Sequence, residues 1–378
     1  MVPVSRTSPI ARTRRTAIPV IALTVVCALA FTGCSGSESG GGSAEADKVT
    51  LVVHDSFPND EVAEAASAAT GYDVEVISAG DGGELTNKLV LTAGAPIADA
   101  FFGVDNIFAS RLVDNDVVVP YTPSELPKGA LEYALGADGS EGDGAGSGSD
   151  AALALTPVDT GATCINIDTA WFEEKGLDEP ETYEDLADPA YRDLTVLLDP
   201  TASSTGASFL VGTVAAFGED GFADYWKRLT DNGARIEQGW SDAYYGQFTQ
   251  GGEGGTRPIV VSYASSPAFT VDDELTASTT KALLDTCTRQ VEYAGVLRGA
   301  ANEAGAKAVV DYLVSHEFQQ TIPDAMYMSP VDDTVEMPEA WAKFAPEPRA
   351  DQTHDLTPEE IERGRERWLG TLGDTIGL

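Results

Sequence analysis

The sequence predicts an α/β fold with a parallel sheet, because apolar strand-like and helix-like segments alternate along the chain. The 378 residues suggest two domains by length. Residues 48–57, 72–80 and 98–106 have the apolar or alternating pattern of strands, and residues 61–70 and 83–94 between them have helical composition. A strand–helix–strand–helix–strand order at this spacing is typical of a parallel α/β sheet.

The alternation continues after a Gly/Ser-rich segment, 136–150, that we interpret as a surface loop. Further elements are expected, in order, within 152–168 (strand), 194–218 (strand, small-residue loop and helix), 257–269 (strand), 289–300 (strand), 301–323 (helix) and 356–372 (helix). The last helix has a capping box, with Thr357 as N-cap, Pro358 in the first helical position and Glu360 three residues after the cap.

The first 33 residues are typical of a signal peptide. Four arginines precede the apolar run "AIPVIALTVVCALAF", and "TGC" follows it. The order Thr32-Gly33-Cys34 resembles a bacterial lipoprotein signal, in which the cysteine becomes the lipidated first residue; the alternative is an ordinary secretory signal. Residues 34–47 are Gly/Ser-rich and are expected to form a flexible tether. We therefore expect an extracytoplasmic protein that is anchored to the cell membrane by lipid.

The charge and the cysteines restrict the classes of function. A net charge of −38 argues against binding to nucleic acid. With Cys27 in the signal and Cys34 lipidated, Cys164 and Cys287 remain, and an oxidising compartment favours a disulfide between them over two separate buried thiols. The chain has three histidines and no zinc-type Cys/His spacing, so we expect no metal and no cofactor.

Polar residues and glycines follow three successive predicted strands. They are His54-Asp55-Ser56, Gly80 to Gly83, and Gly103 with Asp105 and Asn106. Ligands of parallel α/β sheets bind beyond the carboxyl ends of the strands, so these residues mark a candidate site. The segment from Ser203 to Ser208 adds hydroxyl and backbone N–H groups near a helix start, which suits an anion or a phosphate.

The segment "QGWSDAYYGQF" (238–248) places Trp240, Asp242, Tyr244 and Tyr245 close together. It is open to three interpretations: packed core, a metal site built on adjacent tyrosines, or an aromatic clamp for a flat ligand. The sequence contains no Ser-His-Asp order, HExxH or GxSxG motif, which favours a binding protein over an enzyme with catalytic residues. A secreted hydrolase that uses the 203–204 serine loop would lack an evident histidine base.

Seven segments carry a resemblance to a known family. In order they are "VVHDSF", "ADAFFGVDN", "LTPVDTGATCINID", "LLDPTASSTGASFL", "QGWSDAYYGQF", "VVSYASSPAF" and "FQQTIPDAMYMSPV". The chain resembles the periplasmic thiamine-binding proteins, the solute receptors of thiamine ABC importers, over roughly residues 48–370. The resemblance implies a type II periplasmic-binding-protein fold: two α/β lobes joined by a two-segment hinge, with the ligand cleft between them. The implied division is 48–157 (lobe 1, first part), 158–288 (lobe 2) and 289–378 (return to lobe 1 and C-terminal helices).

The resemblance also implies a set of ligand-binding residues. Thiamine joins an aminopyrimidine to a cationic thiazolium with a hydroxyethyl arm, so it requires aromatic faces, acceptors for the pyrimidine edge and hydroxyl or N–H groups for the arm. Tyr327 stands where the family has tryptophan, and Phe269 stands where it has tyrosine and so lacks a hydroxyl. The expected ligand-binding set is Asp55, Asp105, Ser203, Trp240, Tyr244, Tyr263, Phe269 and Tyr327.

The implied function is capture without chemistry. The lobes would close on thiamine, and on its phosphates where these bind, and present it to an ABC permease; we expect a monomer. The Cys164–Cys287 bridge would lie near both interlobe crossings and restrain the hinge. The alternative is a ferric-ion-binding protein that uses Tyr244 and Tyr245, because that class shares the two-lobed fold; another small cationic or phosphorylated solute also stays open.

Overall fold

The computed structural model describes residues 47–136, 152–252 and 254–378. The predicted signal peptide, the lipidated Cys34 and most of the tether lie outside these residues. Within the described ranges, every helix is too short or too polar to cross a lipid bilayer.

The strands form a mixed sheet in the order β2-β1-β3-β10-β6-β9-β7-β8, with β4 beside β10 and with β5 and β11 beside β6. They are β1 (Lys48–Val53), β2 (Asp73–Ser78), β3 (Ala100–Asp105), β4 (Val118–Val119), β5 (Leu135–Gly136), β6 (Leu153–Asp168), β7 (Thr195–Leu198), β8 (Arg235–Glu237), β9 (Ile259–Tyr263), β10 (Thr280–Leu297) and β11 (Ser329–Pro330).

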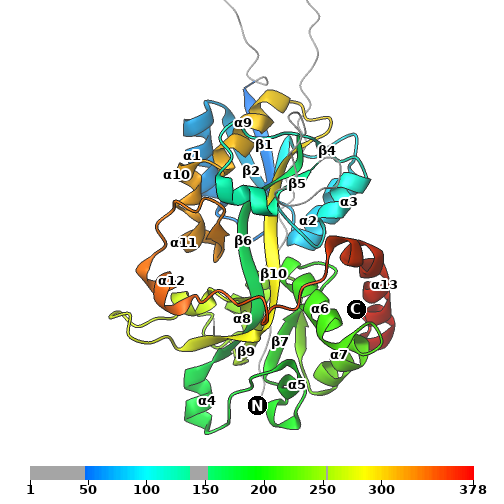
Figure 1. Ribbon diagram of the computed structural model, residues 1–378, viewed down its shortest axis with the longest axis vertical. Coiled ribbons are helices and arrows are strands. Elements are labelled where there is room, and N and C mark those ends of the chain that lie inside the picture. Colours follow the sequence, from blue (N-terminus) through cyan, green and yellow to red (C-terminus); the bar gives the residue numbers. More distant parts are fainter. Residues whose placement is uncertain (1–46, 137–151, 253) are drawn as a thin grey trace, which may run out of the picture. The chain divides into compact units, whose positions relative to one another are not determined.

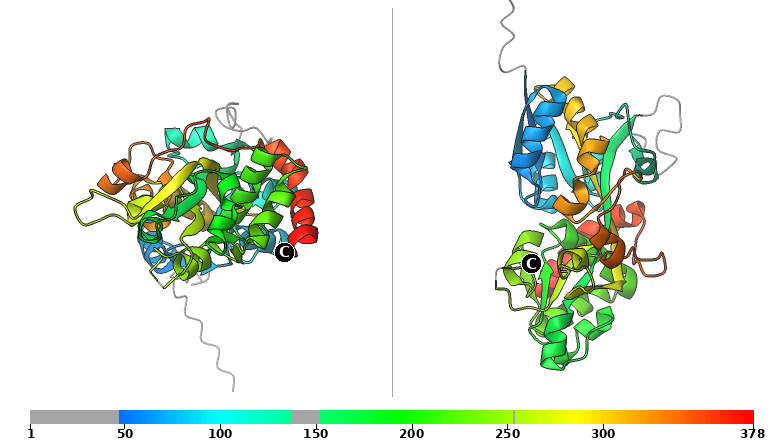
Figure 2. Two further views of the ribbon diagram at one scale, coloured as in Figure 1. Left: turned by 90° about the horizontal axis from the view of Figure 1, so that it is seen from below. Right: turned by 90° about the vertical axis from the view of Figure 1, so that its left-hand side faces the viewer.

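Helices cover both faces of the sheet (Figures 1 and 2). They are α1 (Asn59–Thr70), α2 (Gly82–Leu91), α3 (Ala109–Asp114), α4 (Thr169–Lys175), α5 (Tyr183–Leu186), α6 (Ser204–Phe217), α7 (Phe222–Asp231), α8 (Trp240–Gln247), α9 (Glu303–Leu313), α10 (His316–Gln319), α11 (Ile322–Met326), α12 (Glu339–Phe344) and α13 (Pro358–Ile376).

Two long strands, β6 and β10, run through the middle of the sheet (Figure 1). They are antiparallel to each other, and β10 is also antiparallel to β3. At one end they are flanked by β1, β2 and β3, and at the other by β7, β8 and β9. Both strands are almost continuously buried, which explains their unbroken apolar and small-residue sequences.

The strand and helix predictions are largely confirmed, with two differences. The pairs β1–β2 and β1–β3 are parallel as predicted, but β10 enters between β3 and β6 in the antiparallel direction, so the sheet is mixed. The helix expected over 301–323 is interrupted, because the hydroxyl of Ser315 accepts the N–H of Phe318 and begins a new helix, α10.

Local chemistry fixes the turns that lead to the site. Asp81 is the N-cap of α2, and Ser203 is the N-cap of α6, where its hydroxyl accepts the N–H of Gly206. Gly103 has a φ of +96°, and a Cβ there would collide with the ring of His54. The glycine therefore lets β3 pass close to the histidine that follows β1.

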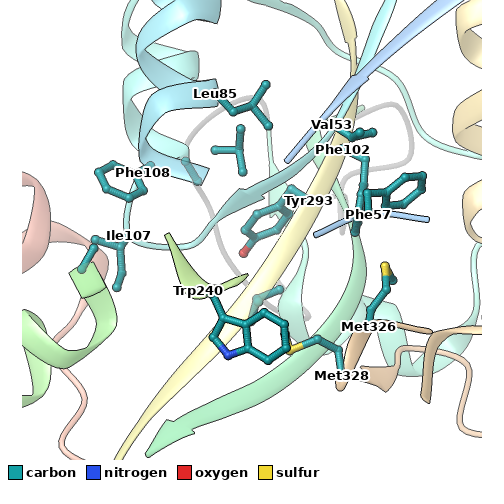
Figure 3. Packing of buried hydrophobic residues seen from close by; sticks show 14 of the residues in the cluster. Val53, Phe57, Leu85, Phe102, Ile107, Phe108, Trp240, Tyr293, Met326 and Met328 are labelled. Carbon is teal, nitrogen blue, oxygen red and sulfur yellow. The ribbon is translucent and has the colours of Figure 1, made fainter. Parts of the chain in front are cut away.

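The largest cluster of buried hydrophobic residues continues to the edge of the site (Figure 3). Phe57 and Phe102 pack with ring centroids 5.2 Å apart. The C-terminal helix α13 packs against α7, and its Arg365 donates to the carbonyl oxygen of Ile107 at 2.6 Å. This buried arginine ties the C-terminal helix to the loop after β3.

The structure joins Cys164 of β6 to Cys287 of β10 in a disulfide that closes a loop of 123 residues. We expect replacement of both cysteines by alanine to lower the free energy of unfolding by about 2–5 kcal/mol, because a cross-link over a long loop restricts the unfolded chain. Urea unfolding followed by circular dichroism measures this. Wild-type protein in excess reductant is the matched control, and an unfolding midpoint that is unchanged in both samples would contradict the expectation.

Candidate ligand-binding site

A pocket of about 70 Å³, the inner pocket, lies beyond the carboxyl ends of β1 and β2 and against the middle of β10. Its walls combine aromatic rings, two methionines and polar groups from both ends of the sheet. The lining residues are His54, Ser56, Asp81, Ser204, Trp240, Ser241, Tyr245, Tyr263, Glu292, Ala325, Met326, Tyr327 and Met328.

Trp240 is the centre of the aromatic wall. It is the first residue of α8, and its indole N–H donates to the hydroxyl of Ser262 at 2.9 Å, which fixes the plane of the ring. The ring stacks on Tyr244, with centroids 4.8 Å apart and planes 15° apart. Tyr245 and Tyr327 meet the indole edge-on at 5.3 and 5.2 Å. The result is a rigid aromatic surface at the pocket.

Tyr327 is held in an uncommon backbone conformation. Its φ is 61°, in the left-handed region that residues with a side chain rarely adopt. The hydroxyl of Ser265 donates to its carbonyl oxygen at 2.5 Å, and Phe269 stacks on its ring with centroids 3.6 Å apart. These contacts hold the Tyr327 ring where it can line the inner pocket.

Asp81 connects three elements at the mouth of the pocket. Its carboxylate accepts the N–H of Gly82 at 2.6 Å, of Trp240 at 3.0 Å and of Ser204 at 3.4 Å. The negative charge thus lies at the N-termini of α2, α6 and α8, where helix dipoles stabilise it. Asp81, Trp240, Ser56 and Ser241 also line a second cavity of about 120 Å³, the outer pocket, which adjoins the inner one.

Three carboxyl groups form a row across the sheet under the inner pocket, and we call this the acidic row. Glu292 of β10 is paired in register with Asp105 of β3 on one side and with Asp159 of β6 on the other. Residues directly opposite one another on adjacent strands project from the same face. All three are buried, with Glu292 only 5% exposed. Its carboxylate accepts from the amide of Gln290 at 3.0 Å and lies 3.7 Å from Nε2 of His54.

Burial raises the pKa of each of these three acids, so each ionises at a higher pH than it would in water. It raises the pKa of Glu292 to about 8, and the charges of Asp105 and Asp81 act in the same direction. Burial also raises the pKa of Asp105 to about 6, although the hydrogen bonds that its carboxylate accepts from the N–H groups of Ile107 and Phe108 oppose this. The pKa of Asp159 is raised well above its ordinary value by burial and by Glu292. Burial lowers the pKa of His54, so the imidazole is neutral near pH 7.

The structure brings four of the eight expected ligand residues to the two pockets. Trp240, Tyr263 and Tyr327 line the inner pocket, and Asp55 lines the outer one. The other four lie behind the pocket walls: Tyr244 is under Trp240, Phe269 is behind Tyr327, Ser203 caps α6, and Asp105 accepts the backbone N–H groups of Ile107 and Phe108. They support the wall instead of forming it.

The sequence reasoning missed several lining residues, above all Glu292, Asp81 and Tyr245. Asp81 falls inside the polar segment, Gly80 to Gly83, that was expected to lie at the site. The sequence did not indicate that its carboxylate would accept N–H groups from three helices. Glu292 had a weaker signal, the alternation of Gln290 and Glu292 within an otherwise apolar strand. Polar residues at alternate positions of a buried strand point to one face, and here that face is the floor of the site.

The adjacent tyrosines do not act as a pair at the pocket. Tyr244 is buried against Trp240, while Tyr245 is 38% exposed and lines the inner pocket. Burial raises the pKa of the Tyr244 phenol far above its ordinary value, which opposes the phenolate form that iron requires. Over the three described ranges, no three His, Cys, Asp or Glu side chains converge in a way that could hold a metal ion.

The chain is similar to several known bacterial proteins. Residues 95–351 match the family of bacterial extracellular solute-binding proteins. A thiamine-binding periplasmic protein of Brucella melitensis is 27% identical over 333 residues, which cover 85% of this chain and 90% of that protein. A periplasmic thiamin binding protein of known structure superposes with a TM-score of 0.72 at 23% identity, covering 87% of this chain and 96% of the other.

A more distant structural neighbour is the iron-bound HitA protein from Pseudomonas aeruginosa. Its TM-score is 0.64 at 17% identity, with 87% of this chain and 99% of that one covered. Such likenesses establish the two-lobed periplasmic-binding-protein fold. Because the family model matches residues 95–351, more than half of the sequence, the chain belongs to the bacterial extracellular solute-binding proteins.

Replacement of Glu292 by glutamine should stabilise the empty protein at neutral pH. The pKa of Glu292 is higher in the folded state than its ordinary value of 4.5, so the folded state binds the proton more tightly and stability falls as pH rises from about 4.5 to 8. Glutamine removes this cost. We expect Glu292→Gln to raise the free energy of unfolding by about 3 kcal/mol at pH 7, and by almost nothing at pH 4.5.

Urea unfolding of both proteins at a series of pH values measures the difference. Glu362→Gln, at an exposed position of α13, removes the same charge without burial and should leave the profile unchanged. A stability difference between Glu292→Gln and the wild type that stays the same from pH 4.5 to pH 7 would contradict a raised pKa of Glu292 in the folded protein.

Proposed function

We propose that this protein binds thiamine outside the cytoplasm and delivers it to an ABC permease. The observation that carries the proposal is the juxtaposition, in one pocket, of the Trp240 aromatic wall and the buried carboxyl of Glu292. A flat organic cation satisfies both, because it stacks on aromatic rings and neutralises a buried acid. The thiamine-binding names of the relatives support the same ligand.

Other parts of thiamine also find partners in the two pockets. The hydroxyethyl arm can donate to the carboxylate of Asp81 or exchange hydrogen bonds with the hydroxyls of Ser56 and Ser241, which are 3.1 Å apart. Met326 and Met328 offer polarisable apolar surface for the pyrimidine ring. Every group named here binds or orients the ligand, and none needs to react with it.

The predicted division into lobes suits this role. We propose that residues 48–157 and the return segment that starts at 289 form one lobe and that residues 158–288 form the other, since β6 and β10 cross between the two groups of strands. The C-terminal helix α13 follows the return segment and packs against α7 of the second lobe. Hinge motion at these crossings would open and close the pocket. We also propose that Cys34 is lipidated and that residues 34–47 tether a monomeric receptor near its permease, on the strength of the "TGC" and Gly/Ser-rich sequence.

Isothermal titration of a chain that starts after Cys34 tests the binding of thiamine. The protein is first stripped of ligand by unfolding and refolding. We expect one-to-one binding at submicromolar strength, and a loss of at least about a hundredfold in Trp240→Ala, because the central stacking surface is removed. Trp240→Phe keeps part of the surface and should lose less.

Trp171→Ala provides the matched control, because this tryptophan of α4 lies outside both pockets. Absence of binding to thiamine, together with a coloured tyrosinate complex on addition of Fe(III), would contradict the proposal and favour the tyrosines of α8 as an iron site.

A further inference from the structure

We propose that Glu292 is the residue that selects a positively charged ligand, and that the ligand's charge replaces a proton on this carboxyl when it binds. The inference rests on the proposed function and deepens it, because it assigns the part of the site that recognises charge and couples binding to release of a proton. The proton is released to solvent. The carboxylate of Glu292 then forms an ion pair with the fixed positive charge of the ligand.

The geometry places Glu292 alone among the acidic row at the pocket surface. Its carboxyl lines the inner pocket, whereas Asp105 and Asp159 on either side are fully buried and do not reach it. Trp240, Tyr263 and Tyr327 line the same pocket, so a ring that stacks on the aromatic wall lies next to the carboxyl. A cation there gains from the aromatic faces and from the charge together.

The groups that surround Glu292 offer it no compensating positive charge. From β3 it meets Asp105, from β6 Asp159, and from the N-terminus of α2 Asp81, all of them acids. From the end of β1 it meets His54, which burial keeps neutral, and from β9 the phenol of Tyr263. The buried Arg365 is engaged by the carbonyl of Ile107 and by the ring of Phe108 instead.

A second feature shows that the acidic row is incompletely satisfied. Both carboxyl oxygens of Asp159 and Nε2 of His54 are buried without a hydrogen-bond partner. Buried polar groups in this state are costly unless they are neutral or a ligand compensates them. In the empty protein a proton on Glu292 limits the charge of the row, and a bound cation can do the same.

Calorimetry in several buffers counts the proton directly. The heat of thiamine binding at pH 7 is measured in buffers with different ionisation enthalpies, and the slope gives the number of protons released. With a pKa of about 8, nearly all Glu292 side chains carry a proton at pH 7, so we expect release of about 0.9 proton for each thiamine bound. The apparent affinity should rise about three- to tenfold from pH 6 to pH 7 and level off above pH 8.5.

Glu292→Gln separates a charge-selecting role from a structural one. We expect this variant to bind thiamine more weakly, with almost no proton release and no rise in affinity with pH. Glu362→Gln should behave as the wild type. The neutral aminopyrimidine half of thiamine, with a hydroxymethyl group in place of the thiazolium, should bind the wild type without releasing a proton.

The outcomes separate this inference from the proposed function. Tight thiamine binding with no proton release, or with release that persists in Glu292→Gln, would overturn the role of Glu292 while leaving thiamine as the ligand. Proton release by the neutral pyrimidine would overturn the exchange of proton for ligand charge. Absence of thiamine binding in every buffer would overturn both proposals.

Discussion

The pairing of β6 with β10 is the constraint on which the rest of the structure depends. These two strands lie side by side through the middle of the sheet, with Glu292 opposite Asp159 and, on the other edge of β10, opposite Asp105. The disulfide joins the same two strands. Because side chains alternate between faces, a shift of one residue in this register would move Glu292 away from the pocket. The floor of the site is therefore set by backbone pairing and cross-linked by a covalent bond.

The groups that recognise the ligand lower the stability of the folded protein. Trp240 is fixed by Ser262 and by stacking on Tyr244, so this part of the aromatic wall is preorganised by contacts within the protein. The acids beneath it are buried at a cost to the free energy of folding, which a hydrophobic replacement would avoid. Such a cost is expected where binding needs a desolvated charge, since a carboxylate in a dry pocket attracts a cation more strongly than one in water. A preorganised wall and a buried acid with no positive partner together favour a flat cation over a neutral ligand.

The sequence predicted the elements and the aromatic wall better than the polar floor. Strands with runs such as "LVV" and "VVSY" were evident, and the unusual "GWSDAYY" segment identified Trp240. The antiparallel insertion of β10 could not be predicted, because strand direction depends on contacts between segments far apart in the chain. For the same reason Glu292 was missed: its importance comes from two acids more than 100 residues away that only the register brings together. Asp105 and Ser203 were expected at the ligand, but each uses its side chain to cap backbone N–H groups nearby.

A crystal structure of the protein with bound thiamine tests the central claim most directly. The account predicts that the thiazolium stacks against the Trp240 wall with its positive charge within about 5 Å of the Glu292 carboxyl, a distance at which opposite charges interact strongly in a buried site. The hydroxyethyl arm should point to Asp81 and the outer pocket. Thiamine bound elsewhere, for example in the cavity beside Arg289 and Trp341, or bound with its cationic ring turned away from Glu292, would contradict the account.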